Sequence, residues 1–289
     1  MNSAAIQKLP AGDMPGDVVV INEDHVLKAD KIYPKLVGLL NPVLSERPSG
    51  RAVVSICGGS GVGKSEIASL LGHKLDNDGI GNYILSGDNY PHRIPAQNDA
   101  ERLRIFRHGG IRGLITNGLI SEERSQTLMR LQMSGEDASP ALTNEHPWLA
   151  AYLKTGRRGL KGYLGTPNEI NFAELSGIIS RFKNGADRIY LKRMCRGEAD
   201  LWYDAVDFHN VKVLIIEWTH GNSDFFEGVD IPVLLNSTPA ETLEHRKSRG
   251  RDGGADRPFT QMVLEIEQEM LAAQANKAKL IISKSGEWE

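Results

Sequence analysis

A glycine-rich segment at residues 58–65 holds the residues best suited to chemistry. It follows the apolar run 52–57 and reads Gly58, Gly59, Ser60, Gly61, Val62, Gly63, Lys64, Ser65. Glycines allow backbone conformations that turn successive N–H groups toward phosphates, the lysine reaches the terminal phosphates, and the serine hydroxyl binds Mg²⁺ at the start of a helix. The segment therefore predicts a P-loop in which residues 58–65 bind a nucleotide and Ser65 binds the metal.

Acidic residues follow two other apolar runs. The run 211–216 is followed by Glu217, where P-loop proteins place the acid that organises Mg²⁺ or its water shell. The run 82–86 is followed by Gly87 and Asp88, and a carboxylate there could take the proton of a hydroxyl attacking the γ-phosphate. We predict Asp88 as a catalytic base and Glu217 as a metal ligand. A plain turn at 87–89 and a solvent-facing Glu217 are the alternatives.

Arginines on a glycine-flanked segment at 245–257 suggest a lid. Such a segment can close over a nucleotide and offset charge in the transition state. We expect Arg246 and Arg249 to act with Lys64 in catalysis and Arg251 to bind the nucleotide. A solvated basic surface is the alternative.

Further basic residues suit an anionic acceptor. His92 and Arg93 follow the proposed base closely, and Arg104 and Arg107 lie on an expected helix over 99–108. Guanidinium groups bind phosphate and carboxylate well, so we assign these residues to the acceptor site. Pairing of the arginines with neighbouring acids on a solvent face is the alternative.

Elements that position these residues can be read from apolar runs and helical periodicity. Strand-like runs at 52–57, 82–86, 211–216, 231–236 and 280–282 alternate with helices such as 240–247 and 259–278. The alternation predicts an α/β fold of the P-loop NTPase type, with a doubly wound, mostly parallel sheet and ligands at the carboxyl ends of its strands.

The remaining regions complete the expected domain organisation. Residues 1–50 form an N-terminal extension packed on the core, with a strand at 17–22 and a short helix at 34–40 opened by Pro34. Residues 51–289 form one catalytic domain. The stretch 99–186 has few β signals and is expected to be a helical insertion that caps the substrate site.

Composition and charge limit the classes of molecule that the protein is expected to bind. The chain has 289 residues, 40% of them hydrophobic, a formal net charge of -3 and two cysteines. Its basic residues form no surplus for nucleic acid, and no apolar stretch approaches the length of a membrane span. We therefore expect a cytoplasmic enzyme with a polar or anionic small-molecule partner and no nucleic-acid or membrane partner; a homodimer is left open.

Four segments, in this order, resemble the phosphoribulokinase and uridine kinase family of P-loop small-molecule kinases. The resemblance covers roughly residues 51–270 and rests on 87–93, 166–172, 213–221 and 245–250. It implies ATP and Mg²⁺ as cofactors, Asp88 as the base, Asn171 on the substrate side, and transfer of the γ-phosphoryl group to a hydroxyl. A sugar, a sugar phosphate or a nucleoside-like metabolite would be the acceptor.

Departures from the family pattern bear on the acceptor. Trp218 stands where the family has a small residue, so we expect its indole to narrow or reshape the acceptor pocket. Pro91 and an extra residue before His92 alter the loop after Asp88. Neither ribulose 5-phosphate nor uridine is therefore carried over as the acceptor.

Two other functions compete with this interpretation. Residues 87–89, with Arg102, Arg104 and Arg107, resemble adenylylsulfate kinase locally. A regulatory P-loop NTPase that acts as a switch is the alternative of another class. A GTPase is disfavoured, because residues 276–279 lack the acid of a guanine-reading motif.

Overall fold

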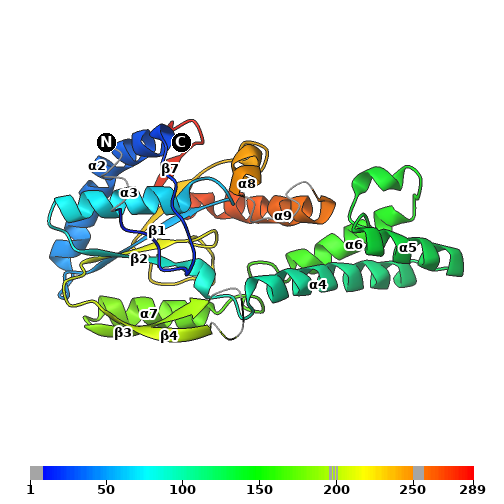
Figure 1. Ribbon diagram of the computed structural model, residues 1–289, viewed down its shortest axis with the longest axis horizontal. Helices are drawn as coiled ribbons and strands as arrows, with labels where there is room; N and C mark the ends of the chain where they lie inside the picture. Colours follow the sequence, from blue (N-terminus) through cyan, green and yellow to red (C-terminus); the bar gives the residue numbers. More distant parts are fainter. Residues whose placement is uncertain (1–8, 195–196, 198, 200, 250–256) are drawn as a thin grey trace.

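A five-stranded sheet, parallel throughout, lies at the centre of the fold (Figure 1). The computed structural model describes residues 9–194, 197, 199, 201–249 and 257–289. The strands lie in the order β2-β5-β1-β6-β7, with bounds β1 Ala52–Gly58, β2 Asn82–Ser86, β5 Val213–Glu217, β6 Ile231–Leu235 and β7 Leu280–Ile282. This sheet confirms the predicted α/β class.

Helices and a hairpin cover the two faces of the sheet. Helices α2 (Glu23–Glu46) and α3 (Lys64–Asn77) lie on one face (Figure 1). Helix α7 (Phe172–Lys183) and the antiparallel hairpin of β3 (Arg188–Met194) and β4 (Leu201–Asp207) lie on the other. All residues of β1 are buried. The strands are apolar because both of their faces are covered.

The N-terminal region differs from expectation at two points. Helix α2 begins at Glu23 rather than Pro34, because Asn22 caps it by accepting a hydrogen bond of 3.0 Å from the His25 N–H. Pro34 therefore lies inside the helix. Residues 17–22 form no strand, since no neighbouring strand offers them hydrogen bonds, and Val18 is 66% exposed.

Three helices extend away from the sheet as an arm (Figure 1): α4 (Pro95–Thr116), α5 (Glu122–Ser134) and α6 (Leu149–Lys161). Helices α4 and α6 approach closely through glycines. A methyl group at Gly110 would lie 2.5 Å from Tyr152 Cδ2. The stretch 99–186 is mainly helical as expected, but α7 packs on the sheet and the hairpin that follows was not foreseen. A capping role for the arm stays a prediction.

Helix α9 (Pro258–Gln274) connects the arm to the sheet (Figure 1). Its residues Val263 and Ile266 share an apolar cluster with Phe106 and Leu160 of the arm. Helix α8 (Leu243–Arg249) precedes it, and short 3₁₀ turns lie at η1 (Gly87–Asn89), η2 (Pro140–Thr143) and η4 (Ala275–Lys277). In the described part of the chain, none of the helices has the length and apolarity that a membrane crossing requires.

Asp230, just before β6, joins the sheet to its covering helices. It accepts hydrogen bonds from Arg47 at 2.7 and 2.8 Å, from Lys183 at 2.8 Å and from the Val53 N–H at 2.8 Å. Burial alone would raise the pKa of this carboxyl. The hydrogen bonds from Arg47, Lys183 and Val53 outweigh burial, so its pKa lies below the ordinary value of 3.8.

We predict that Asp230→Asn lowers the free energy of unfolding by about 1–2 kcal/mol, because two cations lose a charged partner that is only partly screened by water. A lowered folded-state pKa stabilises the fold above the ordinary value, and this contribution is lost as the pH falls below 3.8. Urea titrations across pH measure the difference, which should shrink in acid. Asp187→Asn is the control, because the Asp187 carboxylate is exposed in its ion pair with the buried Arg51, and it should change stability less. A difference that grows in acid would contradict the assignment.

Candidate active site

The P-loop has the backbone that a phosphate cradle needs. Gly58, Gly61 and Gly63 adopt φ angles of 153°, 76° and 100°, which residues with side chains rarely adopt. Helix α3 begins directly afterwards at Lys64, whose Nζ donates to the Gly59 carbonyl at 3.1 Å. The N–H groups of a helix N-terminus favour negative charge. The loop therefore has the geometry of a phosphate cradle, and phosphate binding by residues 58–65 stays a prediction.

The strand register brings the two predicted carboxylates to one edge of the sheet. Glu217 pairs in register with Ile56 of β1 on one side and with Ser86 of β2 on the other. Ser65 Oγ donates to Glu217 Oε2 at 3.0 Å. Asp88 follows β2 in the turn η1 and is exposed. The P-loop serine, Glu217 and Asp88 thus surround the carboxyl ends of β1, β2 and β5.

The electrostatics of this edge suit a cation. Burial and, to a lesser extent, the nearby charge of Asp88 raise the pKa of Glu217 to about 8, against the opposing effects of Ser86, Lys64 and Ser65. Two carboxylates that repel each other beside a hydroxyl offer the hard oxygen ligands that Mg²⁺ prefers. Ser65 and Glu217 therefore fit the metal-binding roles expected of them.

A cavity of about 430 Å³ opens beside the P-loop residue Ser60, between the arm and α9. Arg107 lines it and forms a two-pronged pair with Asp137 at 2.9 and 3.0 Å. Phe259 and Val263 add apolar wall. The cavity combines paired charges with apolar surface, as a site for a polar organic molecule would.

A buried charge cluster lies behind this cavity. Arg102, which also lines the cavity, donates to Glu169 at 2.5 Å, and Glu169 accepts from the Gly165 N–H at 2.6 Å. Burial raises the pKa of Glu169, but Arg102 and the hydrogen bonds lower it more. Burial likewise lowers the pKa of His220 to about 4, helped by the positive charges of Arg102 and Lys64, so the imidazole is neutral at pH 7.

Glu267 is a further acid at this site, and it lies on α9. Burial raises its pKa to about 7, with the negative charges of Glu169 and Asp88 adding to the effect and Arg102 and Lys64 opposing it. Sequence reasoning missed Glu169 and Glu267, because neither lies in a recognised position of a motif. Glu267 lines the cavity, and acids with perturbed pKa values in a cavity are typical of functional sites.

The other predicted acceptor residues contact the chain itself. His92 Nε2 lies 3.0 Å from the Pro167 carbonyl, and Arg93 donates to Tyr163 at 3.0 Å. Asn171 caps α7 and Arg104 pairs with Glu101 on an exposed face, which is the alternative that the sequence left open. Of the predicted acceptor residues, Arg107 lines the cavity. Acceptor contacts of the rest stay predictions.

The Trp218 side chain packs inside the protein and does not form an exposed pocket surface. It is 1% exposed and contacts Phe172, with ring centroids 5.3 Å apart. A methyl group at Gly87 would lie 2.1 Å from Trp218 Cγ. The indole can therefore shape a pocket through its neighbours, among them Phe172, His220 and the turn that carries Asp88.

Among the proposed lid arginines, the structure describes the side chain of Arg246. It is buried and lies against the P-loop, 2.8 Å from where a methyl group on Gly61 would be. One nitrogen, Nη2, donates to the Pro239 carbonyl at 2.9 Å, while Nε and Nη1 lack hydrogen-bond partners among the described residues. Arg251 and the side chain of Arg249 lie outside the described residues.

We predict that Gly87→Ala lowers the free energy of unfolding by about 1–3 kcal/mol, because the added methyl overpacks against a fully buried indole. The shift of tryptophan fluorescence on urea titration measures it. Gly177→Ala, at an exposed helical position with open space around it, is the matched control and should leave stability equal or slightly higher. Equal stability of the two variants would show that the Gly87 turn has room to move.

No family model matches the chain. The chain is 39% identical over 236 residues to a bifunctional alpha-galactosidase/sucrose kinase from Mediterraneibacter gnavus. The match covers 82% of this chain and 20% of that protein, so the chain spans about a fifth of the length of its relative.

Two solved structures were also similar. One is a provisionally assigned fructose transport system kinase from Silicibacter sp. TM1040, with a TM-score of 0.49, 15% identity, and coverage of 88% of this chain and 96% of that one. The other is D-glycerate 3-kinase from Cryptococcus neoformans, with a TM-score of 0.45, 12% identity, and coverage of 89% and 97%. At such TM-scores neither likeness bears on the fold or the function.

Three features of the molecule agree on its class. The parallel sheet has the strand order β2-β5-β1-β6-β7, the P-loop joins β1 to α3, and acids stand after β2 and at the end of β5. This chain is therefore a P-loop protein of the α/β class, and its P-loop and the two acids are among the features by which it resembles the phosphoribulokinase and uridine kinase family.

Proposed function

We propose that the chain is an ATP-dependent kinase that transfers the γ-phosphoryl group to a hydroxyl of a carbohydrate. The carrying observation is the grouping of the P-loop, the Ser65–Glu217 hydrogen bond of 3.0 Å and the exposed carboxylate of Asp88 at one sheet edge. Phosphoryl transfer requires three such parts: a phosphate cradle, a pair of metal ligands and a base.

Each part of the site has its own role in phosphoryl transfer. The P-loop N–H groups and Lys64 hold the phosphates, and Asp88 orients the acceptor hydroxyl and accepts its proton. Arg246, with two guanidinium nitrogens lacking described partners beside the P-loop, offsets charge on the transferring group. Ser65 and Glu217 would hold Mg²⁺, directly or through water, and the bound ion would neutralise charge on the phosphates.

The cavity favours a neutral acceptor over a phosphorylated one. Arg102 and Arg107 are already paired with Glu169 and Asp137, so their charges are balanced within the protein. Carboxylates and paired guanidinium groups suit the hydroxyls of a sugar, which both donate and accept hydrogen bonds. The relative that this chain matches is named as a sucrose kinase, which supports a sugar as the acceptor.

We predict that ADP release from Mg-ATP rises with a mono- or disaccharide. The assay compares neutral sugars, sugar phosphates, nucleosides, polyols and adenylylsulfate, with Lys64→Ala as the blank because that variant lacks the cation on the terminal phosphates. Stimulation by adenylylsulfate alone would favour adenylylsulfate kinase instead. Steady hydrolysis with no response to any acceptor would favour an NTPase switch.

The role of Asp88 has a separate test. We predict that Asp88→Asn keeps ATP affinity within about threefold and lowers sugar-stimulated turnover by about two orders of magnitude or more, because the amide cannot accept the hydroxyl proton. ATP affinity is measured by calorimetry and turnover by ADP release. Asp99→Asn, at a cavity-lining aspartate with no assigned proton role, is the control. Near-normal turnover of Asp88→Asn would remove Asp88 from the mechanism.

A further inference from the structure

Residues 10–13, here termed the N-terminal strap, run across the site edge of the sheet. The Pro10 carbonyl accepts a hydrogen bond from Ser69 of α3. A methyl group on Gly12 would lie 3.4 Å from Glu217 Oε1 and 3.8 Å from Ile84 Cγ2. A segment far from the P-loop in sequence therefore lies against the end of β5.

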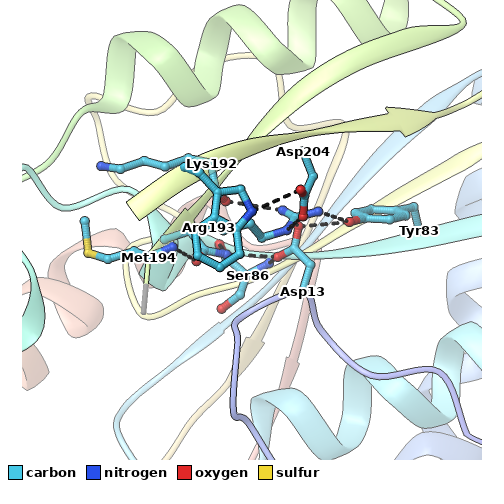
Figure 2. A network of polar contacts seen from close by, with 9 residues as sticks. Asp13, Tyr83, Ser86, Lys192, Arg193, Met194 and Asp204 are labelled. Carbon is cyan, nitrogen blue, oxygen red and sulfur yellow. Dashed lines mark hydrogen bonds and ion pairs between the residues drawn. The ribbon is translucent and has the colours of Figure 1, made fainter. Parts of the chain in front are cut away.

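Asp13, the last residue of the strap, is engaged at both carboxylate oxygens. Oδ1 accepts from the Ser86 N–H at 2.7 Å and from Asn89 Nδ2 at 3.1 Å. Oδ2 accepts from the Tyr83 hydroxyl at 3.0 Å and from Arg193 at 2.8 Å. Figure 2 shows Asp13 between Tyr83, Ser86 and Arg193, and its side chain is 8% exposed.

The two partners of Oδ1 flank the proposed base. Ser86 ends β2, Asn89 ends the turn η1, and Asp88 lies between them. Asn89 is fully buried, and its Oδ1 accepts from the Met194 N–H of β3 at 2.9 Å. The turn is thus held on one side by Asp13 and on the other by the hairpin, while Asp88 itself faces solvent.

Arg193 completes the network from the hairpin. It donates to Asp13, to the Tyr83 hydroxyl at 3.1 Å and to Asp204 at 3.1 Å (Figure 2). Burial raises the pKa of Asp13, against the opposing hydrogen bond from Ser86 and the charge of Arg193. Burying a carboxylate costs free energy unless its oxygens accept hydrogen bonds. Each Asp13 carboxylate oxygen accepts two.

We propose that Asp13 is a positioning residue for phosphoryl transfer: through the Ser86 N–H and the Asn89 side chain it fixes the turn that carries Asp88. This inference rests on the proposed kinase function, because it assigns Asp13 a role in orienting the base. Asp13 belongs to no recognised sequence motif. Only the folded structure shows that it contacts the end of β2 and the turn η1.

Asp13→Asn is the direct test. An amide has one acceptor oxygen and a donor NH₂, so the donor must face either the Ser86 and Asn89 donors or the Tyr83 and Arg193 donors. We expect kcat to fall by about 10- to 100-fold with KM for Mg-ATP changed by less than about threefold, because a small displacement of the base slows chemistry without weakening nucleotide binding.

Asp204→Asn is the matched control. Asp204 contacts the same Arg193 at 3.1 Å, but its side chain is 52% exposed and none of its hydrogen bonds reaches Ser86 or Asn89. We expect its kcat to stay within about twofold of the unaltered protein. Equal losses of kcat in the two variants, or a loss confined to KM for Mg-ATP, would overturn the positioning role.

Amide hydrogen exchange gives a readout that needs no turnover. We expect the Ser86 amide to exchange at least about tenfold faster in Asp13→Asn and unchanged in Asp204→Asn, because the first variant weakens its hydrogen bond. Unchanged exchange at Ser86 in Asp13→Asn would overturn the proposal. If no carbohydrate stimulates the unaltered protein, the kinase function fails, and exchange alone still decides whether Asp13 holds the turn.

Discussion

The hydrogen bond between Ser65 Oγ and Glu217 Oε2 is the contact on which the candidate site depends. It joins the first turn of α3 to the end of β5, and therefore holds the P-loop against the strand that carries the acid. Glu217 is buried at the end of β5, and this burial together with the charge of Asp88 raises its pKa to about 8 despite the hydrogen bond from Ser65. A buried acid of this kind is stable when it is protonated or when a cation lies beside it. The edge of the sheet is thus prepared for a cation together with phosphate.

The parallel sheet explains why the polar groups gather at this edge. Helices and the hairpin cover both faces, so the strands are apolar along their length and polar residues appear where they end. Because the strands run in one direction, the ends of β1, β2 and β5 meet, and residues separated by more than a hundred positions become neighbours. Glu217 and Asp88 interact electrostatically for this reason.

Elements outside the P-loop core supply the rest of the site. Arg102 and Arg107 come from α4, Glu267 comes from α9, and Glu169 lies in the segment before α7. Ion pairs with Glu169 and Asp137 balance the charges of Arg102 and Arg107 in the cavity wall. The N-terminal residues also reach this edge, since His25 at the start of α2 lies against Gly63 of the P-loop.

The sequence by itself determined the class of the fold and the phosphate cradle. The evidence was local: apolar runs of strand length, the glycine spacing at 58–65 and the acids Asp88 and Glu217. Local patterns of this kind can be recognised without knowledge of tertiary contacts. It misplaced the start of α2, because the cap at Asn22 outweighs Pro34 as a start signal. It also missed the hairpin.

Only the tertiary structure decided the partners of the charged side chains. Arg102, Arg104 and Arg107 look alike on one helix, yet the first pairs with buried Glu169, the second with its neighbour Glu101 on the surface, and the third with Asp137 in the cavity. Glu267 became part of the site because α9 packs beside the P-loop. Burial and pairing are set by residues distant in sequence, so no local pattern contains them.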